Sequence, residues 1–189
     1  RAPVFLRVNL ARTDLPGAQA ALAAEGIATE FSPLAKTALE VTENARKIQN
    51  SQPYLQGLVE LQDAASQAVV EALPLADGMR VLDLCAGGGG KTLAIAALAR
   101  LKLFAHDANP ARMRDLPDRA RRAGAKVTLT DKPEKTAPYD LILTDVPCSG
   151  SGSWRRDPQG KWALDEAKLT ALAGVQAAIL RRAAAMVAP

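Results

Sequence analysis

The sequence predicts an α/β fold: a doubly wound, mainly parallel sheet that follows a small α+β appendage. After residue 60, short apolar runs alternate with helical segments, and an aspartate stands at or just after the end of each of four such runs. Strands that alternate with helices at this spacing are typical of a parallel sheet covered by helices. Residues 1–60 lack this alternation, so we expect one module at residues 1–60 and one domain at residues 61–189.

The N-terminal module carries strand and helix signals in short succession. Residues 4–9 alternate as a strand does, and residues 37–41 form a second extended run. Residues 15–25 are rich in alanine and predict a helix that Gly26 ends. The turn-like residues 50–53 open the next region.

The remaining residues predict the sheet and its helices. A helix at residues 62–73 is closed by Pro74, and another begins at Asn109-Pro110, runs toward Arg122 and ends at Gly124. The other expected helices are residues 91–101 and 165–187, and the expected strands are residues 80–84, 102–106, 127–130 and 139–144. In a parallel sheet, ligands gather at the carboxyl ends of the strands. Four aspartates are expected at or near that edge: Asp83, Asp107, Asp131 and Asp145.

A glycine-rich turn joins the first of these strands to its helix. It runs from Asp83 through Cys85, Ala86, Gly87, Gly88, Gly89 and Gly90 to Lys91. Consecutive glycines allow positive φ angles and a close approach of the backbone to a ligand. The start of the following helix offers N–H groups to a negative group.

Three ligand classes use turns of this kind. The dinucleotide pattern G-x-G-x-x-G fits Gly87 and Gly89 but fails at Thr92. The nucleotide-binding pattern G-x-x-x-x-G-K-[ST] fits Gly90-Lys91-Thr92 but has Cys85 at its first position, and it is the best rival. S-adenosylmethionine needs such a turn and an acid after the second strand for its ribose, where Asp107 stands. We therefore predict an S-adenosylmethionine site.

A second motif follows the last predicted strand, where a substrate would meet the cofactor. Asp145, Pro147 and Cys148 stand there, before two Ser-Gly pairs. C5 methylation of cytosine needs a thiolate that attacks C6, and an acid that stabilises the charge on the ring. By chemistry alone, Asp145 suits the second role and Cys148 the first.

Two groups of basic residues accompany these motifs. Arg155, Arg156 and Lys161 lie between Trp154 and Trp162, which favours contact with single-stranded or flipped-out RNA. The other group is interpreted as a solvated helix face: Arg112, Arg114, Arg119, Arg121, Arg122 and Lys126.

Composition sets the remaining expectations. The net charge of +4 is compatible with an anionic partner. Two separate cysteines and the lack of a long apolar run favour a reducing, cytoplasmic setting with no membrane partner. The lone histidine, His106, is expected to be structural, and no metal site is expected. The oligomeric state is not indicated.

The two motifs resemble signatures of the RNA cytosine-5 methyltransferases, the family of bacterial RsmB and the eukaryotic NOL1/NOP2/Sun proteins. Residues 83–92 are similar to D-x-C-A-A-P-G-G-K-T, with two glycines in place of Ala-Pro, and residues 145–152 are similar to D-A-P-C-S-G-x-G. Residues 57–66 and 154–158 resemble the flanking segments. The resemblance implies a Rossmann-like class I methyltransferase with an N-terminal module of the RNA-binding type. It also implies ribosomal RNA as the substrate, with 16S ribosomal RNA as the favoured one. It also implies that residues 85–91, Asp107, Asp131 and Asp145 line the cofactor.

The resemblance changes the role expected of Cys148. In this family the attacking cysteine belongs to a T-C-S motif on the next strand, and the cysteine that corresponds to Cys148 helps to release the methylated RNA. The sequence holds Cys85 and Cys148 as its only cysteines, begins at Arg1 and stops at Pro189. We expect a C-terminally truncated methyltransferase domain that is inactive alone. The alternative is an RNA-binding pseudo-methyltransferase without chemistry.

Overall fold

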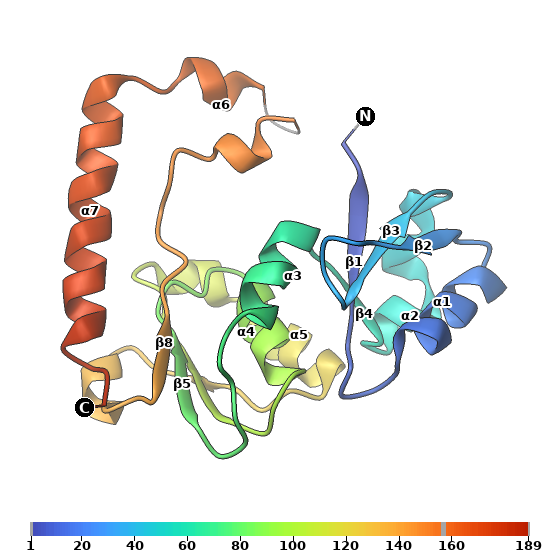
Figure 1. Ribbon diagram of the computed structural model, residues 1–189, viewed down its shortest axis with the longest axis horizontal. Helices are drawn as coiled ribbons and strands as arrows, with labels where there is room; N and C mark the ends of the chain where they lie inside the picture. Colours follow the sequence, from blue (N-terminus) through green and yellow to red (C-terminus); the bar gives the residue numbers. More distant parts are fainter. Residues whose placement is uncertain (1, 156–157, 189) are drawn as a thin grey trace.

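The computed structural model describes residues 2–155 and 158–188, which form two sheets that lie side by side (Figure 1). The N-terminal sheet is antiparallel, in the order β2-β3-β1-β4. Its strands are β1 (Val4–Val8), β2 (Thr29–Phe31), β3 (Ala38–Val41) and β4 (Val59–Leu61). Its helices are α1 (Leu15–Ala24), η1 (Ala45–Asn50) and α2 (Gln52–Leu55).

The expected strands and helix of this module are confirmed, and additional short elements complete it. Leu6 and Val8 of β1 pack with Leu22 of α1, Leu39 of β3 and Ile48 of η1 in one buried core. Strands β2 and β4 were not predicted because three residues are too few to show a clear alternation. β4 pairs with β1, and it spans the expected division at residue 60.

The second sheet is parallel and has the order β7-β6-β5-β8. Its strands are β5 (Arg80–Asp83), β6 (Lys102–Ala105), β7 (Thr128–Leu129) and β8 (Leu141–Leu143). Its longer helices are α3 (Ala64–Glu71), α4 (Gly90–Ala96), α5 (Leu116–Ala123) and α7 (Glu166–Ala184). The shorter helical segments are η2 (Pro110–Met113), η3 (Pro133–Thr136), η4 (Ser151–Ser153) and α6 (Gln159–Trp162).

Helices pack on both faces of this sheet, as predicted, but α3, α4 and α5 share one face and only the C-terminal end of α7 reaches the other. Side chains of a strand alternate between its faces. Val81 of β5 packs with Val70 of α3 and Ile95 of α4. Its neighbour Leu82 packs on the opposite side with Ala183 of α7 and with Met186.

The strand order creates one reversal point between β5 and β8. From β5 the chain moves outward to β6 and β7, and then returns to the other side of β5 as β8. In such open sheets, ligands bind in the crevice at the carboxyl ends of the two strands at the reversal. The turn that follows β5 and the motif that follows β8 therefore meet at one place.

Two predicted helices differ from the structure. The helix expected from Asn109 toward Arg122 is broken into η2 and α5, because Pro117 is tolerated only in the first turn of a helix and forces a new start. The helix expected at residues 91–101 ends at Ala96. There the backbone N–H of Arg100 donates to Asp77 Oδ1 (2.9 Å), which ties this residue to a turn rather than to a helix.

Helix α7 stands away from the rest of the molecule over most of its length (Figure 1). The side chain of Asp165 caps it by accepting from the backbone N–H of Lys168 at 2.8 Å. Of its helical residues only Ala183, near its C-terminal end, is buried. Within residues 2–155 and 158–188, no helix combines the length and apolar character needed to cross a membrane.

A polar joint connects the two sheets. Asn9, which is buried, donates through Nδ2 to the carbonyls of Gly57 and Ala123, both at 2.9 Å. Glu60 of β4 pairs with Arg122 of α5 at 2.8 Å and with Arg119 at 3.5 Å. The interpretation of this arginine group as a solvated face is wrong for Arg119 and Arg122, because a buried carboxylate draws them into the joint.

Candidate active site

The glycine turn after β5 owes its path to Gly89. Gly89 has φ +81° and precedes α4, and its backbone N–H donates to the carbonyl of Ala86 at 2.8 Å. A Cβ atom at this position would lie 2.2 Å from Leu116 Cδ1. Gly87 also has a positive φ, +51°. The turn can therefore pass close to α5 only with glycine at position 89.

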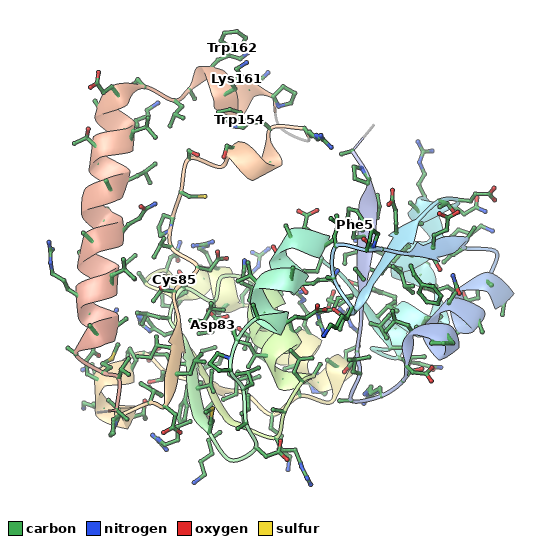
Figure 2. All side chains as sticks on the ribbon, viewed as in Figure 1. Phe5, Asp83, Cys85, Trp154, Lys161 and Trp162 are labelled. Atoms are coloured by element: carbon green, nitrogen blue, oxygen red, sulfur yellow. The ribbon has the colours of Figure 1, made fainter. Side chains whose placement is uncertain are left out.

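Asp83 lies under this turn at the end of β5, beside Cys85 (Figure 2). Its Oδ2 accepts from the hydroxyl of Thr92 at 2.7 Å. Within the described residues, Oδ1 is buried without a hydrogen bond of normal geometry, although the backbone N–H of Cys85 favours its charged form. Burial raises the pKa of Asp83 to about 6, and the negative charge of Asp145 adds to the shift.

Asp107 follows β6 and is buried. Its Oδ2 accepts from the backbone N–H of Gly87 at 2.9 Å and pairs with Arg112 Nη1 at 3.3 Å. Its Oδ1 accepts from the backbone N–H of Asn109 at 2.9 Å. Because a carboxylate oxygen can accept more than one hydrogen bond, Oδ1 keeps acceptor capacity for a further donor.

Asp145 and Lys91 link the two motifs. Lys91 Nζ and Asp145 Oδ2 are 2.6 Å apart, and the Asp145 side chain is 53% exposed. Asp131 lies exposed just after β7, at the same edge of the sheet. The structure thus brings Asp83, Asp107 and Asp145 around the turn and leaves Asp131 on the rim.

Cys85 lies among these carboxylates. Burial raises the pKa of its thiol, and the negative charges of Asp83, Asp107 and Asp145 raise it further, against the effect of Arg112. A thiol in this setting stays protonated near neutral pH and is a poor nucleophile. Cys85 and Cys148 are both free cysteines.

Cys148 follows β8 in an exposed position. It lines a cavity of about 450 Å³ with Leu172 and Val175 of α7. The carbonyl of Pro147 accepts from Gln176 Nε2 at 2.8 Å, so α7 helps to hold this segment. The thiol is open to a ligand in this conformation.

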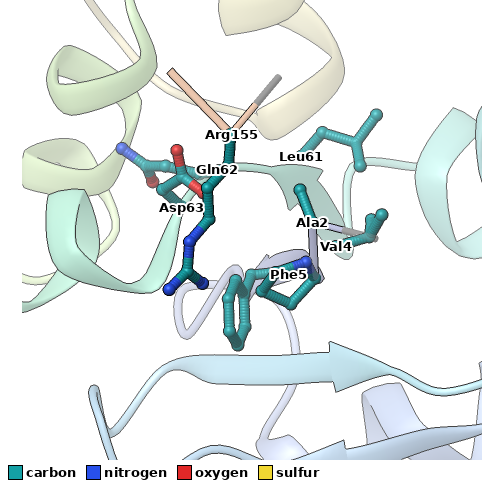
Figure 3. A pocket seen from close by; sticks show the side chains of 8 residues that line it. Ala2, Val4, Phe5, Leu61, Gln62, Asp63 and Arg155 are labelled. Atoms are coloured by element: carbon teal, nitrogen blue, oxygen red, sulfur yellow. The ribbon is translucent and has the colours of Figure 1, made fainter. Parts of the chain in front are cut away.

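A second cavity, of about 650 Å³, lies between the N-terminal sheet, where β1 and β4 line it, and Arg155 of the segment after Cys148 (Figure 3). Phe5 of β1 and Arg155 face it, together with Gln62 and Asp63. Trp162 is 83% exposed, with Lys161 Nζ at 5.5 Å from the centroid of its ring. Arg156 and Asp157 lie outside the described residues.

Other predicted residues have structural surroundings. His106 is buried, with Nδ1 at 2.9 Å from the carbonyl of Thr130 and Nε2 at 3.1 Å from Arg182, so both ring nitrogens have partners within the fold, as a structural residue requires. Sequence reasoning missed Arg112 and Arg119 as partners of the turn. No local pattern could show them, because these contacts join separate strands and helices. Among the described residues, no group of three or more side chains is arranged to hold a metal ion.

Proteins of known activity that resemble this chain in sequence are ribosomal RNA methyltransferases. A family model described as 16S rRNA methyltransferase RsmB/F matches residues 70–189. The chain is 32% identical over 189 residues to ribosomal RNA small subunit methyltransferase B of Xanthomonas campestris, covering 95% of this chain and 43% of that protein. It is also 32% identical over 189 residues to the human 28S rRNA (cytosine(4447)-C(5))-methyltransferase, and the match covers 94% of this chain and 23% of that protein.

A solved structure shares the fold. It is a methyltransferase homolog protein from Pyrococcus horikoshii, with a TM-score of 0.84 and 26% identity, covering all of this chain and 62% of that one. The parallel sheet with its helices is thus a Rossmann-like class I methyltransferase fold. The chain spans less than half the length of the two curated relatives.

Proposed function

The chain belongs to the 16S rRNA methyltransferase RsmB/F family, and we propose that it carries the cofactor site of an enzyme that methylates cytosine C5 in ribosomal RNA. One observation carries the proposal: Asp83, Asp107 and Asp145 lie around Cys85 beside a glycine turn, at the reversal point between the paired strands β5 and β8. The bacterial and human relatives are both named as ribosomal RNA methyltransferases, which supports ribosomal RNA as the substrate class.

The residues of the turn fit S-adenosylmethionine. The cofactor has a cationic amino acid part and a ribose with two hydroxyl donors. Asp83 is buried and its Oδ1 can accept further hydrogen bonds, so it suits the cationic part of the cofactor. Oδ1 of Asp107 can accept from a ribose hydroxyl in addition to the N–H of Asn109. The segment from Cys85 to Lys91 would lie against the bound cofactor, with Asp131 at the rim. When bound, the cofactor supplies the methyl group.

The motif after β8 would handle the cytosine. Asp145, which is half exposed and paired with Lys91, can accept from the N4 amino group and stabilise charge on the ring. The exposed Cys148 would act in release of the methylated base, as the family resemblance implies. The attacking thiol implied by that resemblance belongs to a Thr-Cys-Ser motif that is absent from these 189 residues. The chain alone should therefore bind cofactor without turnover.

The cavity beside Phe5 and Arg155 is the proposed path of the RNA. An aromatic ring and a guanidinium that face one cavity suit an unstacked base and its phosphate. The two free thiols support a reducing, cytoplasmic setting.

Calorimetric titration with S-adenosylhomocysteine tests the cofactor site. We expect the wild-type chain to bind, and Asp107→Asn to weaken binding about tenfold or more, because a charge-assisted hydrogen bond contributes about 1.5–3 kcal/mol. Asp118→Asn is the matched control, since Asp118 of α5 is exposed and pairs only with its helix neighbour Arg121 in the interactions described. A folded wild-type chain that fails to bind would refute the cofactor site.

The pseudo-methyltransferase alternative needs a different readout. In the full-length protein, the enzyme proposal expects methylation of cytosine C5, and Cys148→Ala should accumulate a covalent RNA adduct. RNA binding without methylation by the full-length protein would instead support the non-catalytic alternative.

A further inference from the structure

We propose that Glu60 of the N-terminal module, acting through Arg119, is a positioning residue for the cofactor turn. This inference rests on the proposed function, because it concerns the same turn. Glu60 belongs to β4 of the antiparallel sheet, whereas the turn follows β5 of the parallel sheet. Arg119 of α5 connects them.

Glu60 is a buried carboxylate surrounded by guanidinium groups. Its side chain is 8% exposed and contacts Arg119 through Oε1 at 3.5 Å and Arg122 through Oε2 at 2.8 Å. Burial lowers the pKa of Arg7 of β1 to about 10. The negative charge of Glu60 opposes this shift, and the positive charge of Arg119 adds to it. Two arginines thus pair with one carboxylate, and a third, Arg7, is stabilised by its negative charge. A buried charge is tolerated only when it is paired.

Arg119 carries the contact to the turn. Its Nη1 donates to the carbonyl of Gly88, while Nη2 of the same guanidinium faces Glu60. A Cβ atom on Gly88 would lie 3.2 Å from Arg119 Nη1, so glycine leaves room for this approach. Because the guanidinium is a rigid planar fork, fixing one nitrogen at Glu60 fixes where the other meets Gly88.

Arg122 provides a matched comparison within the same helix. It pairs with Glu60 as Arg119 does, and the two side chains are similarly exposed, at 21% and 23%. Its guanidinium lies over the ring of Tyr54, with Cζ at 4.1 Å from the ring centroid, and so it faces the N-terminal module rather than the turn. Loss of Arg122 should therefore weaken the joint without displacing Gly88.

The test compares Arg119→Gln, Arg122→Gln and Glu60→Gln in the 189-residue chain. S-adenosylhomocysteine affinity is measured by calorimetry, and hydrogen exchange of residues 83–93 is measured without ligand. We expect Arg119→Gln and Glu60→Gln each to weaken affinity about tenfold, which corresponds to about 1.4 kcal/mol. Both should also speed exchange in the turn.

Two further variants separate positioning from general destabilisation. Arg122→Gln should lower the melting temperature as much as Arg119→Gln but leave affinity and exchange in the turn near wild type. Arg119→Lys, which keeps the charge but has a single donor nitrogen in place of the guanidinium fork, should recover part of the affinity. The double variant Glu60→Gln/Arg119→Gln should be no weaker than Arg119→Gln alone, because both act along one route.

The outcomes distinguish this inference from the proposed function. Arg119→Gln and Glu60→Gln could speed exchange in the turn although the wild-type chain does not bind S-adenosylhomocysteine. That result would support the role of Glu60 and Arg119 in positioning the turn and would refute the proposed cofactor site. Wild-type binding with equal effects of Arg119→Gln and Arg122→Gln would refute the positioning. If Glu60→Gln unfolds, the comparison of Arg119→Gln with Arg122→Gln still tests the positioning role. Each of these variants leaves Glu60 paired with the other arginine.

Discussion

Asp83 is a carboxylate buried in the core of a parallel sheet. Its hydrogen bond from Thr92 only partly compensates for the loss of water, so its pKa rises to about 6 from its ordinary value of 3.8. A buried carboxylate with a raised pKa destabilises the folded chain at neutral pH, and such residues are more typical of binding sites than of structural cores. The cost is measurable, because it depends on pH.

We predict that the stability cost of Asp83 appears as pH rises. In the folded chain Asp83 keeps its proton up to about pH 6, whereas in the unfolded chain it loses it near pH 4. Its contribution is therefore fully present below pH 4 and is lost as pH rises through about 6. Relative to wild type, Asp83→Asn should gain up to roughly 3 kcal/mol between pH 4 and pH 7.5, at about 1.4 kcal/mol per pKa unit.

Urea unfolding of both proteins at the two pH values measures this gain. Other titrating groups are common to the two chains, so the difference isolates Asp83. A stability difference that stays constant between these pH values would contradict the raised pKa.

At the scale of elements, the start of α4 determines the shape of the turn. Four glycines precede or open this helix, yet they are not equivalent. Gly89 has a positive φ and no room for a Cβ atom, while Gly90 is the first residue of the helix and a Cβ atom there would make an ordinary contact with Gln62 Nε2 at 3.6 Å. Adjacent positions thus predict opposite responses to alanine.

We predict that Gly89→Ala destabilises the chain by about 3 kcal/mol, from the left-handed backbone and the clash with Leu116 together. Gly90→Ala should be neutral or stabilise by up to about 1 kcal/mol, because alanine favours helix. Thermal unfolding of the two variants gives the comparison. Equal effects at both positions would show that the turn is not held against α5.

At the scale of the whole molecule, the polar joint ties the two sheets into one unit. Asn9 bonds Gly57 of its own module and Ala123 of the other, and a Cβ atom on Gly57 would lie 2.1 Å from the carbonyl oxygen of Arg122. The backbones therefore approach closely around a buried side chain. The division into residues 1–60 and 61–189 remains a prediction from the sequence. The polar joint predicts that these two parts unfold together.

We predict one cooperative unfolding transition for the wild-type chain, with equal calorimetric and van't Hoff enthalpies. Asn9→Ala should cost about 2–3 kcal/mol by leaving two carbonyls without their donor, and should lower the van't Hoff enthalpy below the calorimetric one. Gln19→Ala, which removes a bond to the carbonyl of Thr29 inside the N-terminal module, is the control and should keep the enthalpies equal. Two transitions in the wild type would overturn this prediction.

Local patterns in the sequence determined the parallel sheet, the glycine turn and the acids at its edge. Strand and helix periodicity and the helix ends at Gly26 and Gly124 depend on near neighbours in the chain, so they can be recognised from local sequence. The strands β2 and β4 were missed because pairing with β3 and β1, rather than periodicity, defines them.

The tertiary structure alone decided how the edge is assembled. It placed Asp131 on the rim while Asp83, Asp107 and Asp145 gathered at Cys85, and it assigned Arg112 to Asp107 and Arg119 to Gly88 and Glu60. These pairings join residues far apart in the chain, and their strength depends on burial, which the order of residues does not specify. The sequence determined where a ligand could bind, and the packing of two sheets against α5 decided which side chains hold that place in shape.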